Sequence, residues 1–399
     1  MMRKKRQLLL LIVLLLLLTG CWNRRELNDL GIAVGLGLDK VGKQYQVSAQ
    51  VVDPAEVAAK KGASARTPVI LFRASGNTIA EALRKLTTES PRRIYVAHLR
   101  MLVIGESLAR EGMGKALDFL SRDQELRTDF FIVVAKGTRA ENTLKILTSL
   151  EDIPAVKLFS SLQTSEENWA PTLAVTLDEL ITDLVSEGKH PVLTSLELKG
   201  NKEAGQTRKN VEVLKPLVRL EYTGLAVFKK DKLIGWLSPE ESKGYNFLVD
   251  NVNTTIGHLT CPDGGKLGVE VIRAKTIRKG QVKNGKPQIN VEVRIEQNVG
   301  EVACKIDLTK PKTIYELEKK SEQRVTGIIE NAIKKVQKTY KVDIFGFGKA
   351  IYRADPAAWQ KLKKNWDKTF VNLPVNVKVD VKIRRLGTVS NSFLNEMKK

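Results

Sequence analysis

The chain has few of the residues that usually carry catalytic or metal-binding chemistry. Among its 399 residues are three cysteines and three histidines. His98, His190 and His258 lie far apart, and none belongs to a zinc-binding helix motif. Cys261 and Cys304 also lack the CxxC pairing of a structural zinc site. We therefore expect no metal site, no cofactor, and structural or surface roles for the histidines.

Sequence motifs of common enzymes are missing as well. The chain has neither a GxSxG nucleophile elbow nor a phosphate-binding loop. The glycines of segment 30–39 have the wrong spacing for a dinucleotide-binding turn, and a strand pattern follows them. The adjacent Glu240 and Glu241 are explained more simply by helix capping than by acid–base catalysis. The sequence thus predicts a protein that is not an enzyme. A wall-modifying enzyme is kept as the least favoured of three hypotheses about its function.

Long apolar runs are absent except near the N-terminus. There, Leu8–Leu18 forms an unbroken apolar run of eleven residues. As a helix it would span roughly 16 Å, whereas the hydrocarbon core of a bilayer needs about 30 Å. Four cations precede the run and are the only charges before Cys21: Arg3, Lys4, Lys5 and Arg6. This pattern is typical of a secretory signal peptide, which we assign to residues 1–20.

The end of this segment predicts a lipid anchor. Leu18, Thr19, Gly20 and Cys21 form a tetrad that resembles the lipobox of bacterial lipoproteins. The resemblance implies that Cys21 becomes the first mature residue and carries S-diacylglycerol and N-palmitoyl groups. Several acyl chains anchor a protein stably where one chain does not. Trp22, directly after this cysteine, is an aromatic residue of the kind found at membrane–water interfaces.

Acidic residues are too few to balance the basic ones, and the formal net charge is +21. Removal of residues 1–20 takes away four positive charges and no negative charge, which leaves +17. Such a surface favours an acidic partner. An exported protein rarely meets nucleic acid, so we expect an anionic membrane surface or wall polymer; a generally solvated basic surface is the alternative. Segment 271–290 carries six cations and no acid and is the most localised basic face.

The two remaining cysteines leave a choice open. An extracytoplasmic compartment permits a disulfide between Cys261 and Cys304. Two cysteines in so long a chain do not make a disulfide framework, and two buried free thiols are the favoured alternative.

Hydrophobic periodicity predicts an α+β fold in which helices and strands mix along three successive parts of the chain, with largely antiparallel sheets flanked by helices. The first domain covers residues 21–200 and begins with a hairpin over 30–52. Its helices start at capping boxes led by Thr78, Thr138 and Thr176. Further expected elements are strands at 69–74, 94–98, 101–104 and 130–135, and a helix at 106–122 that breaks near Gly112.

Segment 199–210 is nearly devoid of apolar residues and predicts a linker or a long hairpin loop. A strand-rich middle domain follows at 211–300, with a hairpin at 224–237 and a capped helix that begins after Ser238. The C-terminal domain, 301–399, contains a long amphipathic helix up to about Tyr340. Its last strand alternates apolar and polar residues, and we expect the long helix to cover the apolar side.

Several blocks of the sequence resemble the Ger(x)C family of spore germination lipoproteins. The first are CWNRREL after the lipobox, and then GLGLDK. RIYVAHLRMLVIGESLAREG and LDFLSRDQELR follow. The C-terminal half contributes GLAVFKKDKLIGWLSPEESKGY and YKVDIFGFGKAIYRADPAAW. The resemblance covers nearly all of the chain from Cys21 to about Gly387.

The resemblance implies a subunit of three mixed α/β domains on the outer face of the spore inner membrane, in complex with integral-membrane A-type and B-type receptor subunits. It implies a role in nutrient-triggered germination and supplies no catalytic residues. A lipid-anchored solute-binding protein that captures a small nutrient directly is the alternative.

Overall fold

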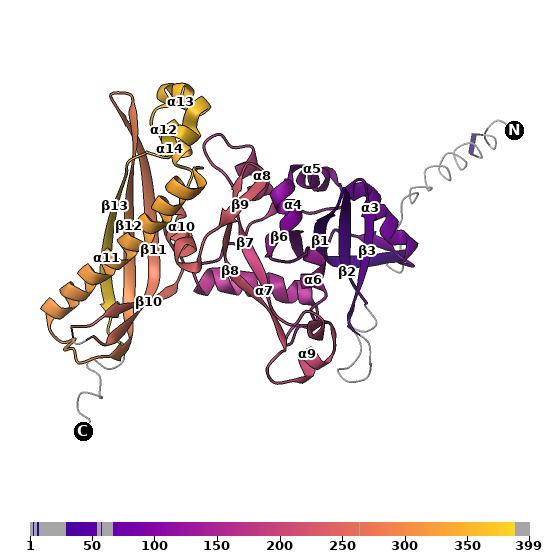
Figure 1. The fold of residues 1–399 in the computed structure, drawn as a ribbon, viewed down its shortest axis with the longest axis horizontal. Coiled ribbons are helices and arrows are strands. Elements are labelled where there is room, and N and C mark those ends of the chain that lie inside the picture. Colours follow the sequence, from indigo (N-terminus) through magenta and orange to yellow (C-terminus); the bar gives the residue numbers. More distant parts are fainter. Residues whose placement is uncertain are drawn as a thin grey trace.

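The computed structural model describes residues 29–53, 67–262 and 264–387, together with the isolated residues 3, 6, 7 and 57. The signal peptide, the lipobox and Cys21 lie outside the described residues. Figure 1 shows two β-sheets with their helices, lying side by side along the long axis of the molecule.

The first sheet is mixed and has nine strands, in the order β3-β2-β1-β5-β6-β7-β8-β9, with β4 paired to β1. Its centre, β1-β5-β6-β7, is parallel, whereas the pairs at both ends are antiparallel. The strands are β1 (Leu30–Val41), β2 (Gln44–Val52), β3 (Val69–Gly76), β4 (Arg93–Tyr95), β5 (Met101–Gly105), β6 (Phe131–Lys136), β7 (Val192–Gly200), β8 (Val218–Lys229) and β9 (Lys232–Trp236).

Helices cover both faces of this sheet, as a parallel centre requires. Along β5, Leu102 and Ile104 face one hydrophobic core, while Met101 and Val103 face the other. The helices of the first face are α3 (Ile79–Lys85), α4 (Glu106–Glu111), α5 (Gly114–Arg122) and α8 (Leu177–Leu184). Those of the second face are α6 (Ala140–Leu144) and α7 (Pro154–Asn168).

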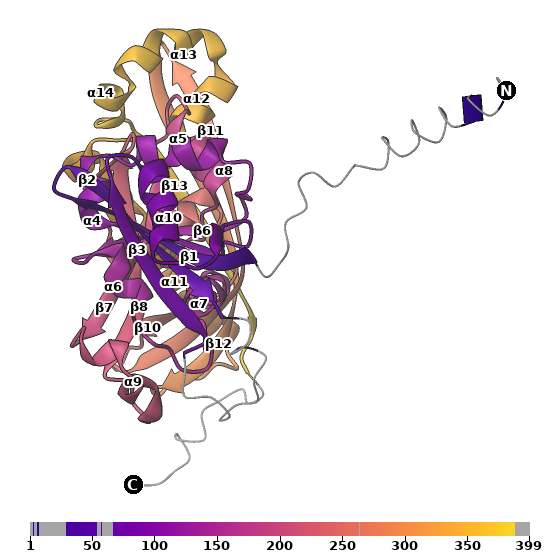
Figure 2. The same ribbon diagram turned by 90° about the vertical axis from the view of Figure 1, so that its right-hand side faces the viewer.

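The second sheet has four strands in the order β10-β11-β12-β13. β10 (Thr255–Thr260), β11 (Lys266–Lys283) and β12 (Lys286–Ala303) form an antiparallel meander, and β13 (Val375–Arg385) runs parallel to β12. α10 (Pro239–Val249) and the long α11 (Pro311–Lys335) pack on its apolar face. Three short helices follow at one end of the sheet, α12 (Phe347–Ala354), α13 (Pro356–Leu362) and α14 (Trp366–Phe370). Figure 2 shows them together at that end of the molecule.

Helix capping follows the sequence at three of the four expected positions. Ser238 accepts from Glu241 N at 3.2 Å, and Glu241 accepts from Ser238 N at 2.8 Å. Glu179 likewise accepts from Thr176 N at 3.0 Å. At the start of α3, Thr78 caps the helix through its hydroxyl. These caps form because both partners lie within one turn of the chain.

The box led by Thr138 was a wrong prediction, because the cap of α6 comes from a distant strand. Asp39, fully buried in β1, accepts from Ala140 N at 2.8 Å and from Glu141 N at 3.0 Å. Glu141 turns away and accepts from Gln46 at 2.8 Å. Burial raises the pKa of the Asp39 carboxyl, and the two backbone donors oppose that rise.

The structure confirms the α+β class, with helices around largely antiparallel sheets. The hairpin β8–β9 forms as expected but joins the first sheet beside β7, so segment 201–217 is a long hairpin loop. The strands β10 to β12 share their sheet with β13. Strands of segment 211–300 are thus divided between the two sheets, because β8 and β9 belong to the first and β10 to β12 to the second.

Candidate functional site

A network of buried polar contacts lies where the two sheets meet. One hydrophobic core spans the junction, and it combines Val192, Leu225 and Val227 of the first sheet with Val291 and Val293 of the second. Tyr340 adds a polar link, because its hydroxyl donates to Trp236 O at 2.6 Å and accepts from Trp236 N at 3.1 Å. The two sheets thus form one packed body rather than two loosely tethered ones.

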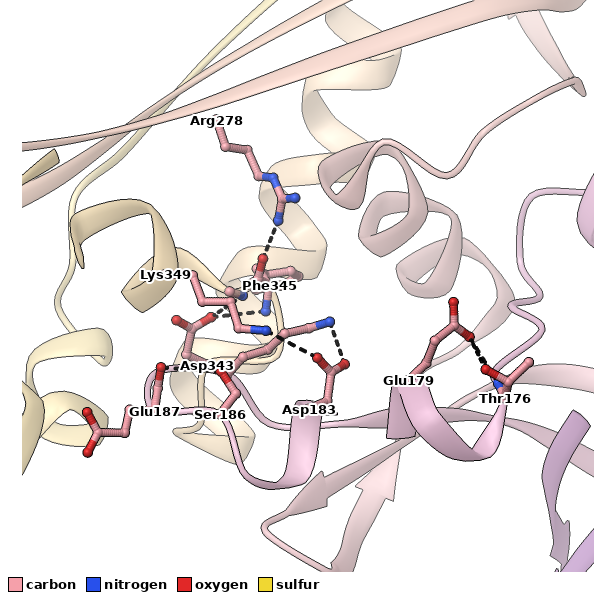
Figure 3. Close-up of polar contacts among 11 residues, drawn as sticks. Thr176, Glu179, Asp183, Ser186, Glu187, Arg278, Asp343, Phe345 and Lys349 are labelled. Atoms are coloured by element: carbon pink, nitrogen blue, oxygen red, sulfur yellow. Dashed lines mark hydrogen bonds and ion pairs between the residues drawn. The ribbon is translucent and has the colours of Figure 1, made fainter. Parts of the chain in front are cut away.

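A buried carboxylate, Asp343, organises the turn that leads into α12. It is fully buried and accepts from the backbone N–H groups of Phe345 at 3.0 Å, Gly346 at 2.9 Å and Gly348 at 2.8 Å. Trp366 Nε1 of α14 donates to the same carboxylate at 3.0 Å. Burial raises the pKa of Asp343, although these donors act in the opposite direction. Figure 3 shows Asp343 and Phe345 within this turn.

The segment Gly346–Gly348 (GFG) has two glycines, which let this turn contact the loop before β7 of the first sheet. Gly346 has a φ of +73°, and a Cβ at Gly348 would come 2.6 Å from Gly188 Cα and 2.7 Å from Trp359. Gly188 itself has a φ of +81°. The two backbones are therefore in direct contact, so the segment serves both as a tight helix entry and as a close-packing site.

Ion pairs and a hydrogen bond from charged side chains stabilise the same junction. Asp183, at the end of α8, binds Lys189 at 2.5 Å and Lys349 of α12 at 3.4 Å. Arg278 reaches from β11 and donates to Phe345 O. Figure 3 shows Arg278 above the turn and Lys349 facing Asp183. Burial lowers the pKa of Arg278, as expected for a cation held inside a protein.

His190 connects three parts of this junction. Its backbone N–H donates to Asp343 O at 2.6 Å. Its ring Nδ1 accepts from Lys230 N at 3.0 Å, so the proton of the neutral ring resides on Nε2, which faces Asp367 at 3.3 Å. Its hydrogen bond to Asp367 is the largest of the interactions that lower the pKa of that carboxyl. His190 therefore links the β8–β9 turn to α14 and to the turn before α12.

Chemically, this arrangement holds two parts of the molecule in a fixed relation. The charged groups named here are engaged with protein partners, and the described residues contain no cluster of His, Cys, Asp and Glu able to hold a metal ion. The described helices also include none long and apolar enough to cross a bilayer. The contacts at the junction thus hold the two sheets together.

The residues singled out from the sequence are not gathered at this junction. Cys21, with Leu18, Thr19 and Gly20, lies outside the described residues. Cys261 and Cys304 are joined in a disulfide, with Cα atoms 6.4 Å apart, at the far end of the second sheet. This is the arrangement that the sequence left as the less favoured alternative.

The expected basic face at 271–290 is present only in part. Arg278 points inward, and Lys275 pairs with Asp250 at 2.5 Å. Besides Lys275, four cations of the segment are exposed, namely Arg273, Lys279, Lys283 and Lys286. Exposed cations of α12 to α14 extend this surface, namely Arg353, Lys361, Lys364 and Lys368. We call these residues of α12 to α14, together with Lys279, Lys283 and Lys286, the basic end; Arg273 is left out, because it lies in the middle of β11, opposite Glu296.

Sequence reasoning missed the central residues of the junction. Gly188 gave no signal of its own, because its partners Gly348 and Trp359 lie far along the chain. Asp343 binds N–H groups only two to five residues further on, but it was recognisable only through the glycines that follow it. The GFG segment gave the one usable sign, since two glycines so close to a helix start indicate a backbone that needs special conformations or close approach.

Comparison with known protein families accounts for nearly the whole chain. Residues 23–198 match a family described as "Spore germination protein N-terminal domain". Residues 223–387 match "Spore germination B3/ GerAC like, C-terminal". The boundary between the two matches falls in the hairpin loop and β8.

Individual relatives are similar in sequence to this chain along all or most of its length. Spore germination protein KC of Bacillus subtilis (strain 168) is 34% identical over 409 residues, which cover all of both chains. Spore germination proteins B3 and A3 of the same organism are 23% and 25% identical, and each match covers 93% of this chain and 95% of the relative. A solved structure titled "Crystal Structure of the GerBC protein" matches with a TM-score of 0.56, at 20% identity, over 88% of this chain and 96% of that one.

Proposed function

Because the chain belongs to the Ger(x)C, or GerAC-like, family of spore germination proteins, we propose that it is the lipid-anchored C subunit of a nutrient germinant receptor. The observation that carries the proposal is the full-length similarity to spore germination protein KC, combined with a lipobox at Leu18–Cys21. The subunit resides on the extracytoplasmic face of the spore inner membrane. It acts without catalysis.

The anchor limits how far the folded body can move from the bilayer. Cys21 precedes the start of β1 at Leu30 by nine residues. A fully extended chain spans at most about 3.3–3.6 Å per residue, so the start of β1 stays within about 30 Å of the lipid. The basic end supports an anionic membrane surface as one partner, since its cations would lower their energy near acidic head groups.

The other partners are the integral-membrane A-type and B-type subunits of the receptor. Confinement to a surface raises the local concentration of each subunit, so contacts too weak to hold in solution suffice for assembly. The rigid junction around Asp343 supports this role, because a subunit that transmits a signal must move its parts together.

Replacement of the acylated cysteine tests the proposal. Cys21→Ala removes the thiol that takes the lipid. We expect this variant to leave the spore membrane fraction and nutrient-triggered germination to fall strongly at unchanged total protein. Asn23→Ala is the matched control, because it alters the same segment and keeps the cysteine. Normal germination of Cys21→Ala spores, or equal loss in both variants, would contradict the proposal.

A further inference from the structure

A cavity of about 280 Å³ lies between the helices of the second sheet and the sheet itself. α10 and α11 form one wall, β10 to β12 form the floor, and Trp169 at the end of α7 closes one side. Most of the lining is apolar and includes Phe247, Leu259, Val269, Val271, Val325 and Ile328. A volume near 300 Å³ suits a small organic molecule.

The floor of this cavity contains polar atoms that lack partners. Thr255, Val271 and Gln297 are opposite one another on three neighbouring strands, so their side chains share the face beneath the helices. Gln297 is 1% exposed and Thr255 is 3% exposed. Among the described atoms, Gln297 Nε2 and Thr255 Oγ1 have no hydrogen-bond partner.

The amide of Gln297 is half satisfied. Ser321 of α11 donates to Gln297 Oε1 at 2.9 Å, which leaves the buried amide nitrogen of this lining residue without a partner among the described atoms. Turning the amide over would only exchange the two ends, because Ser321 can bind one end at a time. A buried polar group without a partner destabilises the fold, so a ligand that supplies an acceptor removes that cost.

The mouth of the cavity carries one excess positive charge. Glu240 and Arg324 pair with each other at 2.7 Å. Lys243 has its ammonium over the Trp169 ring at 4.5 Å and donates to Ile256 O at 3.0 Å. Burial lowers the pKa of Lys243, and the nearby charge of Glu240 opposes that shift.

We propose that this cavity binds a small apolar carboxylate, whose hydrocarbon part fills the space between α10, α11 and the sheet and whose oxygens accept from Gln297, Thr255 and Lys243. Water alone is a poor occupant, because an apolar cavity of this size offers each water too few partners. The binding does not depend on the lipid anchor or on the receptor assembly.

Isothermal titration calorimetry with 4-methylpentanoate tests the proposal on the purified full-length protein, held in lipid nanodiscs so that no detergent competes. We expect saturable binding at one site per chain. Methyl branching and one carboxylate match the apolar walls and the polar floor. 4-Methylpentan-1-ol, which lacks the charge, should bind about tenfold more weakly.

Two variants separate the cavity from the rest of the surface. Gln297→Leu should weaken carboxylate binding about tenfold, because it removes one charge-assisted hydrogen bond. Val325→Trp should abolish binding by filling the space. Gln288→Leu makes the same change on the same strand outside the cavity and should bind like the unaltered protein. Absence of saturable binding, or full binding by Gln297→Leu and Val325→Trp, would overturn the proposal, whereas loss in these two and not in Gln288→Leu supports it.

Discussion

At Gly188 and Gly348 the structure depends on the absence of a single side-chain atom. The backbones of the two residues touch, and a Cβ on Gly348 would lie within 2.7 Å of both Gly188 and Trp359. Neither neighbour is the flexible end of a side chain, so the junction itself must shift to admit a methyl group.

We therefore predict that Gly348→Ala lowers the free energy of unfolding by about 1–3 kcal/mol, as overpacking does. At Gly327, inside α11, a Cβ would meet no heavy atom within 4 Å. Gly327→Ala should therefore raise the free energy of unfolding by about 0.5–1 kcal/mol, because alanine has the higher helix propensity. Urea unfolding of both variants measures the difference. Equal effects would contradict the close contact at Gly348.

The contribution of Glu197 to the stability of the fold depends on pH. Burial alone would raise the pKa of its carboxyl, but Lys136 at 2.7 Å and Lys199 outweigh burial and lower the pKa from 4.5 to about 2. A carboxyl with a depressed pKa stabilises the fold above its unfolded pKa and loses that contribution as pH falls toward the folded value.

We predict that unaltered protein melts at a higher temperature than Glu197→Gln near pH 7, and that the gap closes between about pH 4.5 and 2. Thermal melts of both proteins across this range check it. A gap that stays constant with pH would mean that the carboxylate charge contributes nothing.

At the scale of helices and strands, the sequence predicted what local rules control. Val375–Arg385 alternates as expected, and its Val379 and Val381 are buried beneath α11. The cap at Ser238 was predicted because its partner is three residues away. The cap of α6 was not, since Asp39 lies 101 residues before the N–H group of Ala140 that it binds.

This contrast between near and distant caps can be measured. Ser238→Ala should lower the free energy of unfolding by about 0.5–2 kcal/mol, because it removes the hydroxyl that caps α10. Thr138→Ala, in the segment that only resembles a capping box, should change it by less than about 0.5 kcal/mol. Denaturant unfolding checks both values, and the reverse order would argue for Thr138 as the true cap.

At the scale of the whole molecule, local pattern predicted the class of the fold but not the membership of its sheets. The hairpin β8–β9 carried no sign that it would extend the first sheet beside β7 rather than begin a middle domain. Likewise, β13 reaches β12 only after the long segment that contains α11 to α14, and pairs with it in parallel. Such pairings depend on the complete core, which no single segment encodes.

The disulfide closes a large loop within the second sheet. Cys261 and Cys304 are 43 residues apart in sequence. A bond over such a loop contributes about 2–4 kcal/mol. We predict that the denatured protein shows two thiols at these positions only after reduction, and that Cys261→Ser with Cys304→Ser lowers the free energy of unfolding by this amount. Two reactive thiols without reductant would contradict the bond.

The central claim is that a lipid at the first mature residue holds this folded body at the membrane. Mass spectrometry of the N-terminal peptide, from protein isolated out of spore inner membranes, tests it most directly. The account predicts a peptide that begins at Cys21 and carries diacylglycerol and a palmitoyl group. A peptide that retains residues 1–20, or one with an unmodified Cys21, would contradict it.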